Sequence, residues 1–259
     1  MQASEYNTLR AAEEHHWWYL VLRGLVSRAL VGRLPPRGYI LDAGCGTGGM
    51  LGFLQKGIRC LDVEGVDASE LAVNHCQQRG LNMVKQAPVE RMPFEDGEFD
   101  AVLSLDVLYH SGVDEEKALK EMSRVLGPGG LLVVNLPAFE CLRGSHDLAV
   151  CGARRYRACQ VRSLIEQHSL AVEMIHYWNA WLFSPLFVWR KLSRLGEKKE
   201  SEVMSDLHQM PEWLNRMLTF AGLVDAWLCR VFHIPFGSSV FAVAHKVNPS
   251  TGGLDHGSK

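Results

Sequence analysis

The feature that most constrains the fold is a glycine-rich turn that directly follows an apolar segment. Tyr39, Ile40 and Leu41 read as the end of a buried parallel strand, and residues 44–49 read Gly-Cys-Gly-Thr-Gly-Gly. Glycines at such a turn let the backbone bend sharply and approach a ligand closely, and a helix would begin at Met50. The sequence therefore predicts a strand, a turn and a helix with a nucleotide-sized pocket at the turn.

The glycines alone do not identify the ligand. Gly44, Gly46 and Gly49 also fit the pattern of dinucleotide-binding proteins, so a nicotinamide cofactor remains open at this point. Asp42, two residues before the first glycine, favours a different ligand. A carboxylate there would repel a pyrophosphate at the helix N-terminus but could hold an ammonium group. The pattern thus favours a cationic ligand.

The segments downstream alternate between expected strands and expected helices. We expect strands at residues 38–42, 61–67, 82–85, 99–105, 131–136, 171–177 and 239–246. We expect helices at residues 8–33, 48–56, 69–79, 114–126 and 161–168, and two aromatic-rich helical stretches within 178–236. Alternation of this kind predicts a parallel sheet covered by helices on both faces.

With these features, residues 37–136 resemble the class I S-adenosylmethionine (SAM) dependent methyltransferases. The resemblance is carried by Asp42 with the glycine turn, by Asp67 at the end of the second strand, and by the fourth and fifth strands with the turn at residues 125–130. It implies an α/β fold, a doubly wound, seven-stranded, mostly parallel sheet of the Rossmann-like methyltransferase type, with SAM as the cofactor. The element His16-Trp17-Trp18 is similar to the start of one small-molecule subgroup.

The same resemblance suggests a division of the chain. We expect an N-terminal helical lid (1–36), a SAM-binding α/β core (37–177), a helical insert (178–236), a final antiparallel strand that completes the core (237–247) and a flexible tail (248–259).

The resemblance also assigns cofactor-binding roles. The backbone of Gly44, Cys45 and Gly46, with Asp42 nearby, would hold the methionyl part of SAM. Asp67 would accept hydrogen bonds from the ribose hydroxyls.

The adenine would lie against Ala68 and Leu105, whose side chains are apolar. Many relatives bind the adenine amine with an Asp that here is replaced by Pro88. The backbone of Val89, next to Glu90, remains available for that contact.

Arg23 has two readings, an ion pair with the SAM carboxylate or a solvated helix position.

Methyl transfer from a sulfonium leaves a neutral thioether, so the site needs alignment and, for a protonated acceptor, a base. Asp106, Tyr109 and His110 follow the fourth strand, where they could face the sulfonium and the acceptor. His110 has the most suitable ordinary pKa for a base, although it could equally support the loop.

A second polar cluster follows the fifth strand. His146 with Asp147 could act as a base and its orienting carboxylate, or could position the substrate. For Arg154 and Arg155 we favour salt bridges that anchor this loop, with recognition of a phosphate or carboxylate as the alternative.

Composition narrows the partners. The 259-residue chain has a net charge of −2, which gives no broad basic field, so nucleic acid is not an expected partner. The seven cysteines form no Cys-x-x-Cys pair, which argues against a disulfide framework and a zinc site, and we expect no metal. Together with the lack of a signal peptide pattern, this favours the cytoplasm.

The aromatic-rich insert has two readings. The one we favour is a set of helix faces buried on a neighbouring element or on a partner in a homodimer. The other is an apolar acceptor pocket or contact with a membrane surface.

The sequence thus predicts a SAM-dependent methyltransferase acting on a small or medium-sized acceptor, with oxygen favoured as the methylated atom. An N- or C-methyltransferase on the same fold and a SAM-binding scaffold or regulatory protein without turnover remain alternatives.

Overall fold

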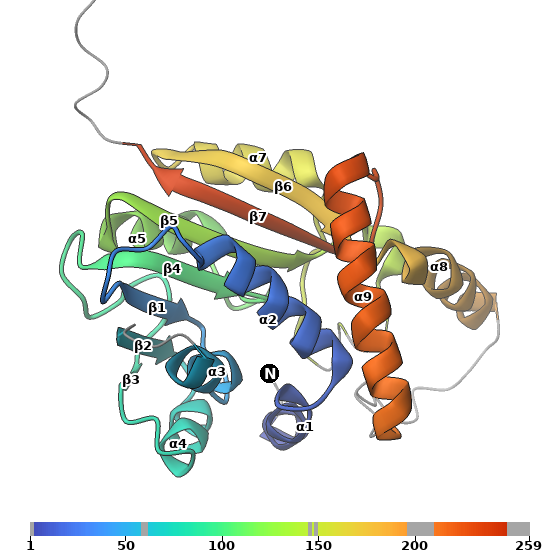
Figure 1. Ribbon diagram of the computed structural model, residues 1–259, viewed down its shortest axis with the longest axis horizontal. Coiled ribbons are helices and arrows are strands. Elements are labelled where there is room, and N and C mark those ends of the chain that lie inside the picture. Colours follow the sequence, from blue (N-terminus) through green and yellow to red (C-terminus); the bar gives the residue numbers. More distant parts are fainter. Residues whose placement is uncertain (1–2, 58–61, 145–146, 148–149, 196–209, 248–259) are drawn as a thin grey trace, which may run out of the picture.

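The computed structural model describes residues 3–57, 62–144, 147, 150–195 and 210–247 (Figure 1). Its centre is a seven-stranded sheet with the strand order β3-β2-β1-β4-β5-β7-β6. The strands are β1 (Tyr39–Ala43), β2 (Asp62–Asp67), β3 (Val84–Gln86), β4 (Phe99–Leu105), β5 (Leu126–Pro137), β6 (Leu170–Trp178) and β7 (Ser239–Lys246). Their positions agree with the strands expected from the sequence, and the predicted fold class is confirmed.

Helices cover both faces of this sheet. They are α1 (Ala3–Glu13), α2 (Trp17–Leu30), α3 (Gly49–Gly57), α4 (Glu70–Gln78), α5 (Glu115–Val125), α7 (Ala158–Glu166), α8 (Ala180–Leu195) and α9 (Glu212–Phe232), with a 3₁₀ turn at Glu140–Leu142. Figure 1 shows α2 and α9 in front of the sheet and α5 and α7 behind it.

Strand direction determines where a ligand can bind. β1 pairs in parallel with both β2 and β4, so the order of the strands reverses at β1. Ligands of open α/β sheets bind beyond the carboxyl ends of the strands at such a reversal. β7 runs antiparallel to both β5 and β6, as the sequence predicted for the final strand.

Alternating side chains along the strands build a separate core on each face. Ile40 and Leu103 pack with α2 on one face, and their neighbours Leu41 and Val102 pack with α5 on the other. Strands buried on both faces read as continuous apolar runs, which is why their positions were predictable.

The prediction of one helix over residues 8–33 was wrong, because the chain forms two helices there. α1 ends at Glu13 and α2 begins at Trp17, with His16 as its N-cap. The Nδ1 atom of His16 accepts from the backbone N–H of Trp18 at 3.3 Å. Histidine is not among the favoured N-cap residues, so the sequence carried no strong signal for this break.

Two glycines let α2 and α9 approach closely. A Cβ atom on Gly222 would lie 2.7 Å from Cγ2 of Val21, and one on Gly24 would lie 2.9 Å from Cδ2 of Leu223. The close approach fixes α9, and with it the end of β6, against the N-terminal segment.

The aromatic residues of the insert have mixed environments. Trp178 is fully buried, whereas Trp213, Phe220, Trp227 and Phe232 are each more than half exposed. The favoured reading, burial against a neighbour, therefore holds for only part of the set. The charged run at residues 197–200 lies outside the described residues. Within the described part of the chain, no helix is long and apolar enough to cross a bilayer.

The contact between α2 and α9 gives a prediction about stability. We expect Gly222→Leu to lower the free energy of unfolding by about 1–3 kcal/mol, because the added side chain must displace the fully buried Val21. Ala221→Leu, on the exposed side of the same helix turn, is the matched control and should change it by about 0.5 kcal/mol or less. Thermal or denaturant unfolding measures both variants. Equal stability of the two would contradict this packing.

Candidate active site

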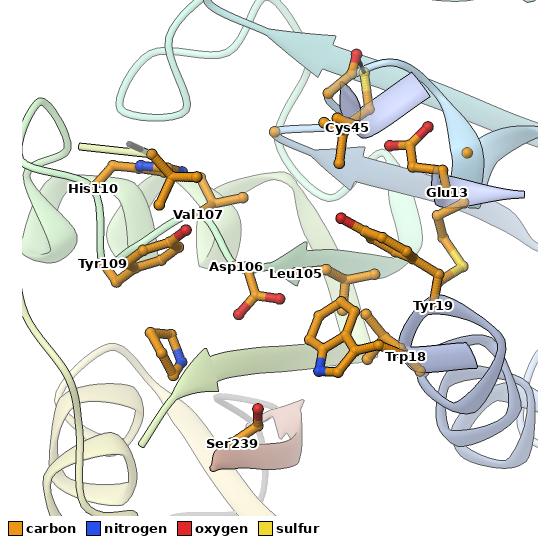
Figure 2. Close-up of a pocket in the computed structure, with 18 of the residues that line it drawn as sticks. Glu13, Trp18, Tyr19, Cys45, Leu105, Asp106, Val107, Tyr109, His110 and Ser239 are labelled. Carbon is orange, nitrogen blue, oxygen red and sulfur yellow. Dashed lines mark hydrogen bonds between the residues drawn. The ribbon is translucent and has the colours of Figure 1, made fainter. Parts of the chain in front are cut away.

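A cavity of about 910 Å³ opens at the carboxyl ends of β1, β2 and β4. Its wall is formed by α1, α2, the glycine turn, the loop after β4, the loop after β5 and the start of α8. Figure 2 shows labelled side chains from α1, α2, the glycine turn and the segment after β4 arranged around the cavity.

The sequence-predicted site residues converge on this cavity. Those that line it are Arg23, Asp42, Gly44, Cys45, Gly46, Asp67, Ala68, Val89, Glu90, Leu105, Tyr109, His110 and Asp147. His146 lies outside the described residues.

The glycine turn approaches the cavity with its backbone. Gly44 and Gly46 have φ angles of +86° and +54°, which glycine adopts readily. A Cβ atom on Gly44 would also lie 2.4 Å from Cγ2 of Val107, so no larger residue fits there.

Asp67 is held in place by the same turn. Its carboxylate accepts from the backbone N–H of Gly46 at 3.0 Å and from that of Ser69 at 2.9 Å. Each oxygen keeps further acceptor capacity, so the carboxylate can still bind a pair of hydroxyls.

Asp42 is a buried carboxylate with neighbours of like charge. Its side chain is only 2% exposed, and burial raises its pKa to about 8, with further contributions from Glu13 and Asp67. Burial also raises the pKa of Glu13 and of Asp67. Three acids that share one cavity wall suit a ligand that carries positive charge.

Glu13 was missed by the sequence analysis. It accepts from the hydroxyl of Thr47 at 2.5 Å and from Nη2 of Arg79 at 3.2 Å, and it packs so closely that a Cβ atom on Gly49 would lie 2.6 Å from its carboxylate. Glu13 thus fastens α1 to the glycine turn. The sequence contains no sign of this contact, because Thr47 lies 34 residues from Glu13 along the chain and only the tertiary fold brings them together.

Arg23 is a half-buried residue rather than a solvated helix position. It donates to the carbonyl of Gly49 at 3.0 Å, and its guanidinium lies 5.3 Å from the ring centroid of Phe53. The side chain therefore places positive charge at the rim of the glycine turn.

Asp106, the first residue after β4, points into the centre of the cavity. Figure 2 shows its carboxylate between Tyr109 and Trp18, facing Ser239. Asn135 donates to both of its oxygens at 3.1 and 3.0 Å. Burial raises the pKa of Asp106 to about 7, against the opposing effects of Asn135 and Arg155.

The orientation of Asn135 is itself fixed. The indole Nε1 of Trp178 donates to its Oδ1 at 2.9 Å, which leaves the amide nitrogen facing Asp106. The resulting chain from Trp178 through Asn135 to Asp106 joins β6, β5 and β4.

His110 is more constrained than the sequence suggested. Burial lowers its pKa, while hydrogen bonds to the backbone of Val150 and Asp106 act in the opposite direction. Its ring packs on Tyr109 with centroids 4.3 Å apart. These contacts match the loop-supporting reading of His110.

Asp147 is engaged by the loop that it belongs to. Arg155 donates to its two oxygens at 2.9 and 3.1 Å, and the backbone N–H of Gly144 donates at 2.8 Å. Arg154 pairs with Glu115 at 2.8 Å. Both arginines anchor the loop, as predicted.

The expected adenine side of the cavity is largely apolar. Val89 is 5% exposed, and Leu105 and Ala68 lie at the ends of β4 and β2. Glu90 accepts from the backbone N–H of Asp114 at 2.9 Å, which ties the segment after β3 to the start of α5.

Within the described ranges, no three His, Cys, Asp or Glu side chains are grouped to hold a metal ion.

Residues 41–134 match a family model described as a methyltransferase domain. The chain is 36% identical over 121 residues to a sarcosine/dimethylglycine N-methyltransferase of Halorhodospira halochloris, covering 43% of each chain. It is 36% identical over 95 residues to a fatty-acid O-methyltransferase of Mycolicibacterium smegmatis, covering 35% of this chain and 34% of that one. The matches thus span less than half of the length of these relatives.

The fold likeness extends over the whole chain. A structure of a SAM-dependent methyltransferase from Thermotoga maritima, described as a possible histamine N-methyltransferase, is similar with a TM-score of 0.58 and 19% identity. It covers 94% of this chain and 95% of that one.

The matched domain contains the glycine turn with Asp42 and Asp67. Residues 41–134 are thus matched as a methyltransferase domain, and the chain has the fold of the class I, SAM-dependent methyltransferases.

Proposed function

We propose that this protein transfers the methyl group of SAM to a hydroxyl group of a small or medium-sized acceptor, with Asp106 as the general base. The observation that carries the proposal is the arrangement of buried carboxylates around one cavity, where Asp42 lies at the glycine turn and Asp106 at the centre.

The residues present fit the cofactor. SAM carries a sulfonium and an ammonium group, and the cavity wall holds the carboxylates of Asp42 and Asp67, with Glu13 beside them paired to Arg79. The backbone of the glycine turn would hold the methionyl part, with Arg23 beside it, and Asp67 would hold the ribose. The cofactor supplies an electrophilic methyl group.

The cavity has room for an acceptor beside the cofactor. Ligand pockets usually measure about 300–1,000 Å³, and this one lies near the upper end at about 910 Å³. Burial of the site keeps water away from the reacting atoms and so favours transfer to the intended acceptor.

Asp106 suits the role of base better than His110 does. Its carboxylate faces the cavity and its pKa of about 7 leaves a substantial ionised fraction at neutral pH. Burial lowers the pKa of His110, and its ring is hydrogen-bonded to the backbone of Val150 and Asp106. The alternative is that His110 is the base, and comparison of the Asp106→Asn and His110→Asn variants distinguishes the two.

The relatives support methyl transfer but not one acceptor atom, because their names include both an O- and an N-methyltransferase. We favour oxygen because an alcohol arrives protonated and needs the base that Asp106 provides. A small-molecule acceptor also agrees with the near-zero net charge of the chain.

The pKa of Asp42 gives a prediction about cofactor binding. With a pKa of about 8, Asp42 is mostly protonated at pH 7 before binding, and a bound cation favours its ionised form. SAM binding should therefore release protons, and its affinity should rise with pH up to about 8 and then level off. Calorimetry at pH 7 in two buffers of different ionisation enthalpy measures this release.

Asp42→Asn should remove most of the proton release and weaken SAM binding roughly 10- to 100-fold, because a charge-assisted contact is lost. Asp62→Asn, an exposed acid at the opposite end of the neighbouring strand β2, is the matched control and should bind as the wild type does. Unchanged affinity and proton release in Asp42→Asn would refute the role of Asp42. Calorimetry with NAD in place of SAM tests the alternative of a nicotinamide cofactor, which predicts binding of NAD and none of SAM.

The proposed base gives a prediction about catalysis. In a screen of alcohols, phenols and amines that follows S-adenosylhomocysteine formation, we expect turnover with a hydroxyl acceptor. The kcat/KM should rise as pH increases through about 7, because the base acts in its ionised form. Asp106→Asn should lower kcat by about 100-fold or more while SAM affinity stays within about twofold.

Asparagine tolerates the positive φ of +55° at this position, so the variant should fold. The pH profile of the His110→Asn variant is measured for comparison with that of Asp106→Asn. Loss of the rising limb of the pH profile in His110→Asn but not in Asp106→Asn would assign the base to His110. SAM binding without turnover on any acceptor would favour the scaffold reading.

A further inference from the structure

One polar side chain of the cavity has no role in the reaction proposed above. Asn179 directly follows β6, has no exposed surface and lines the cavity. In the described part of the chain, neither Nδ2 nor Oδ1 of Asn179 has a hydrogen-bond partner. Such a buried, unpartnered polar group destabilises the folded protein, so its presence calls for a ligand or another reason.

The surroundings of Asn179 hold it in this position. Its φ angle is +58°, a conformation that few residues other than glycine, asparagine and aspartate adopt. The preceding Trp178 is anchored by its hydrogen bond to Asn135, and Asp225 accepts from the first two N–H groups of α8 at 3.2 Å each. The amide is thus preorganised on two fixed elements.

The sheet sets the relation between Asn179 and Asp106. β4 and β6 run in the same direction with β5 and β7 between them, so both residues lie at the same edge of the sheet. Three strand spacings separate the axes of β4 and β6, which is about 14 Å. Pro137 and Ser239, at the ends of β5 and β7, line the cavity between them.

The side chains above this edge are apolar. Leu142, Leu182, Leu186 and Met210 line the same cavity. A ligand that runs from Asp106 to Asn179 would therefore need an apolar body with a polar group at each end.

We propose that Asn179 binds the distal polar group of an elongated, neutral acceptor whose reacting hydroxyl lies at Asp106. The amide offers an unpartnered donor and an unpartnered acceptor, so the complementary group both donates and accepts, as a carboxamide does. The proposal rests on the proposed function for the position of the reacting end.

The test compares two probes of equal chain length on the whole protein saturated with S-adenosylhomocysteine. One is 12-hydroxydodecanamide and the other is dodecan-1-ol, which lacks the distal amide. We expect calorimetry to give at least about tenfold tighter binding of the amide, because a site built to hydrogen-bond a group rejects the analogue without it. Equal binding of the two probes, or binding of neither, overturns the proposal.

Asn179→Gly separates recognition from backbone conformation. Glycine accepts the positive φ and removes the amide, so the variant should melt at the same or a higher temperature yet lose the preference for the amide probe. If Asn179 served the backbone alone, Asn179→Gly would keep that preference.

Methyl transfer to the probes is measured separately with SAM in place of the product. Selective binding without turnover would count against the proposed function and leave the recognition role intact. Turnover of both probes at equal KM would support the proposed function and count against the recognition role of Asn179.

A second, independent observation concerns the outer face of α9. Trp213, Met217, Phe220, Val224, Trp227 and Val231 are between 40% and 71% exposed and follow one another at alternating intervals of four and three residues. This spacing is that of a coiled-coil seam, which is narrower than the usual apolar face of a helix.

We infer that this stripe packs antiparallel against the same stripe of a second copy of the chain. A two-fold axis near the middle of α9 places Trp213 against Val231 of the partner subunit and Phe220 against Val224 of the partner subunit, so that large side chains face small ones. Glu212 in the first turn then lies near Arg230 of the partner subunit, and the helix dipoles oppose each other.

The area agrees with a stable pair. A whole aromatic side chain has an area of about 150–250 Å², and the six residues are about half exposed on average. If the contact covers this exposed surface, they bury roughly 700 Å² on each copy. A standard stable interface buries about 800 Å² on each partner.

Light scattering after size-exclusion chromatography tests this pairing at roughly 50 μM, a concentration at which an interface of that size is expected to hold. We expect a dimer for the wild type and a monomer for Phe220→Glu. Met83→Glu, which places the same charge on a 57% exposed methionine outside α9, should remain dimeric. A monomeric wild type, or a dimer that persists in Phe220→Glu, overturns the inference. A monomer that pellets with anionic vesicles through Phe220 would identify a membrane as the occupant instead.

Discussion

The burial of carboxylates next to a glycine turn is the constraint on which the rest of the site depends. Asp42 lies in the interior strand β1 at 2% exposure, and Glu13 and Asp67 approach it from α1 and β2. Such a set destabilises the ligand-free protein unless its members are held by hydrogen bonds or neutralised by protons. Thr47, Arg79 and two backbone N–H groups hold Glu13 and Asp67, whereas Asp42 responds by a raised pKa. Under the proposed function, a cationic cofactor would remove the remaining repulsion, so that cofactor affinity and the raised pKa of Asp42 would have one cause.

The centre of the sheet was predictable from the sequence because strands β1, β4, β5 and β7 are buried along most of their length. Apolar runs such as residues 101–103 and 240–244 within these strands have no helical period, and a glycine or an acid lies close to each of them. The grouping of Asp42 and Asp67 at one cavity was predictable for a related reason, since both lie near the ends of strands whose positions follow from those runs. Strand ends of a parallel sheet meet at one edge, so residues distant in sequence converge without any further information.

The parts that were not predictable depend on contacts across the fold. The break between α1 and α2 is made by a histidine cap, and Glu13 matters only because the fold brings it to Thr47. The link from Trp178 through Asn135 to Asp106 spans residues far apart in the chain and requires the order β4-β5-β7-β6, in which the final strand lies between β5 and β6. On α9 both faces are apolar, so periodicity could not tell the face that packs on α2 from the face that stays exposed.

Asp106 and Asn179 share a property that bears on how the site is built. Both directly follow strands, both have positive φ angles, and both direct polar side chains into a region that would be more stable with apolar ones. Backbone strain and poorly satisfied polar groups persist where the surrounding structure over-determines them and where function needs them. Here the surrounding structure is the same for both residues, since Trp178 anchors Asn135 beneath Asp106 and also precedes Asn179. A single buried indole therefore sets the positions of the two polar ends between which an acceptor would bind.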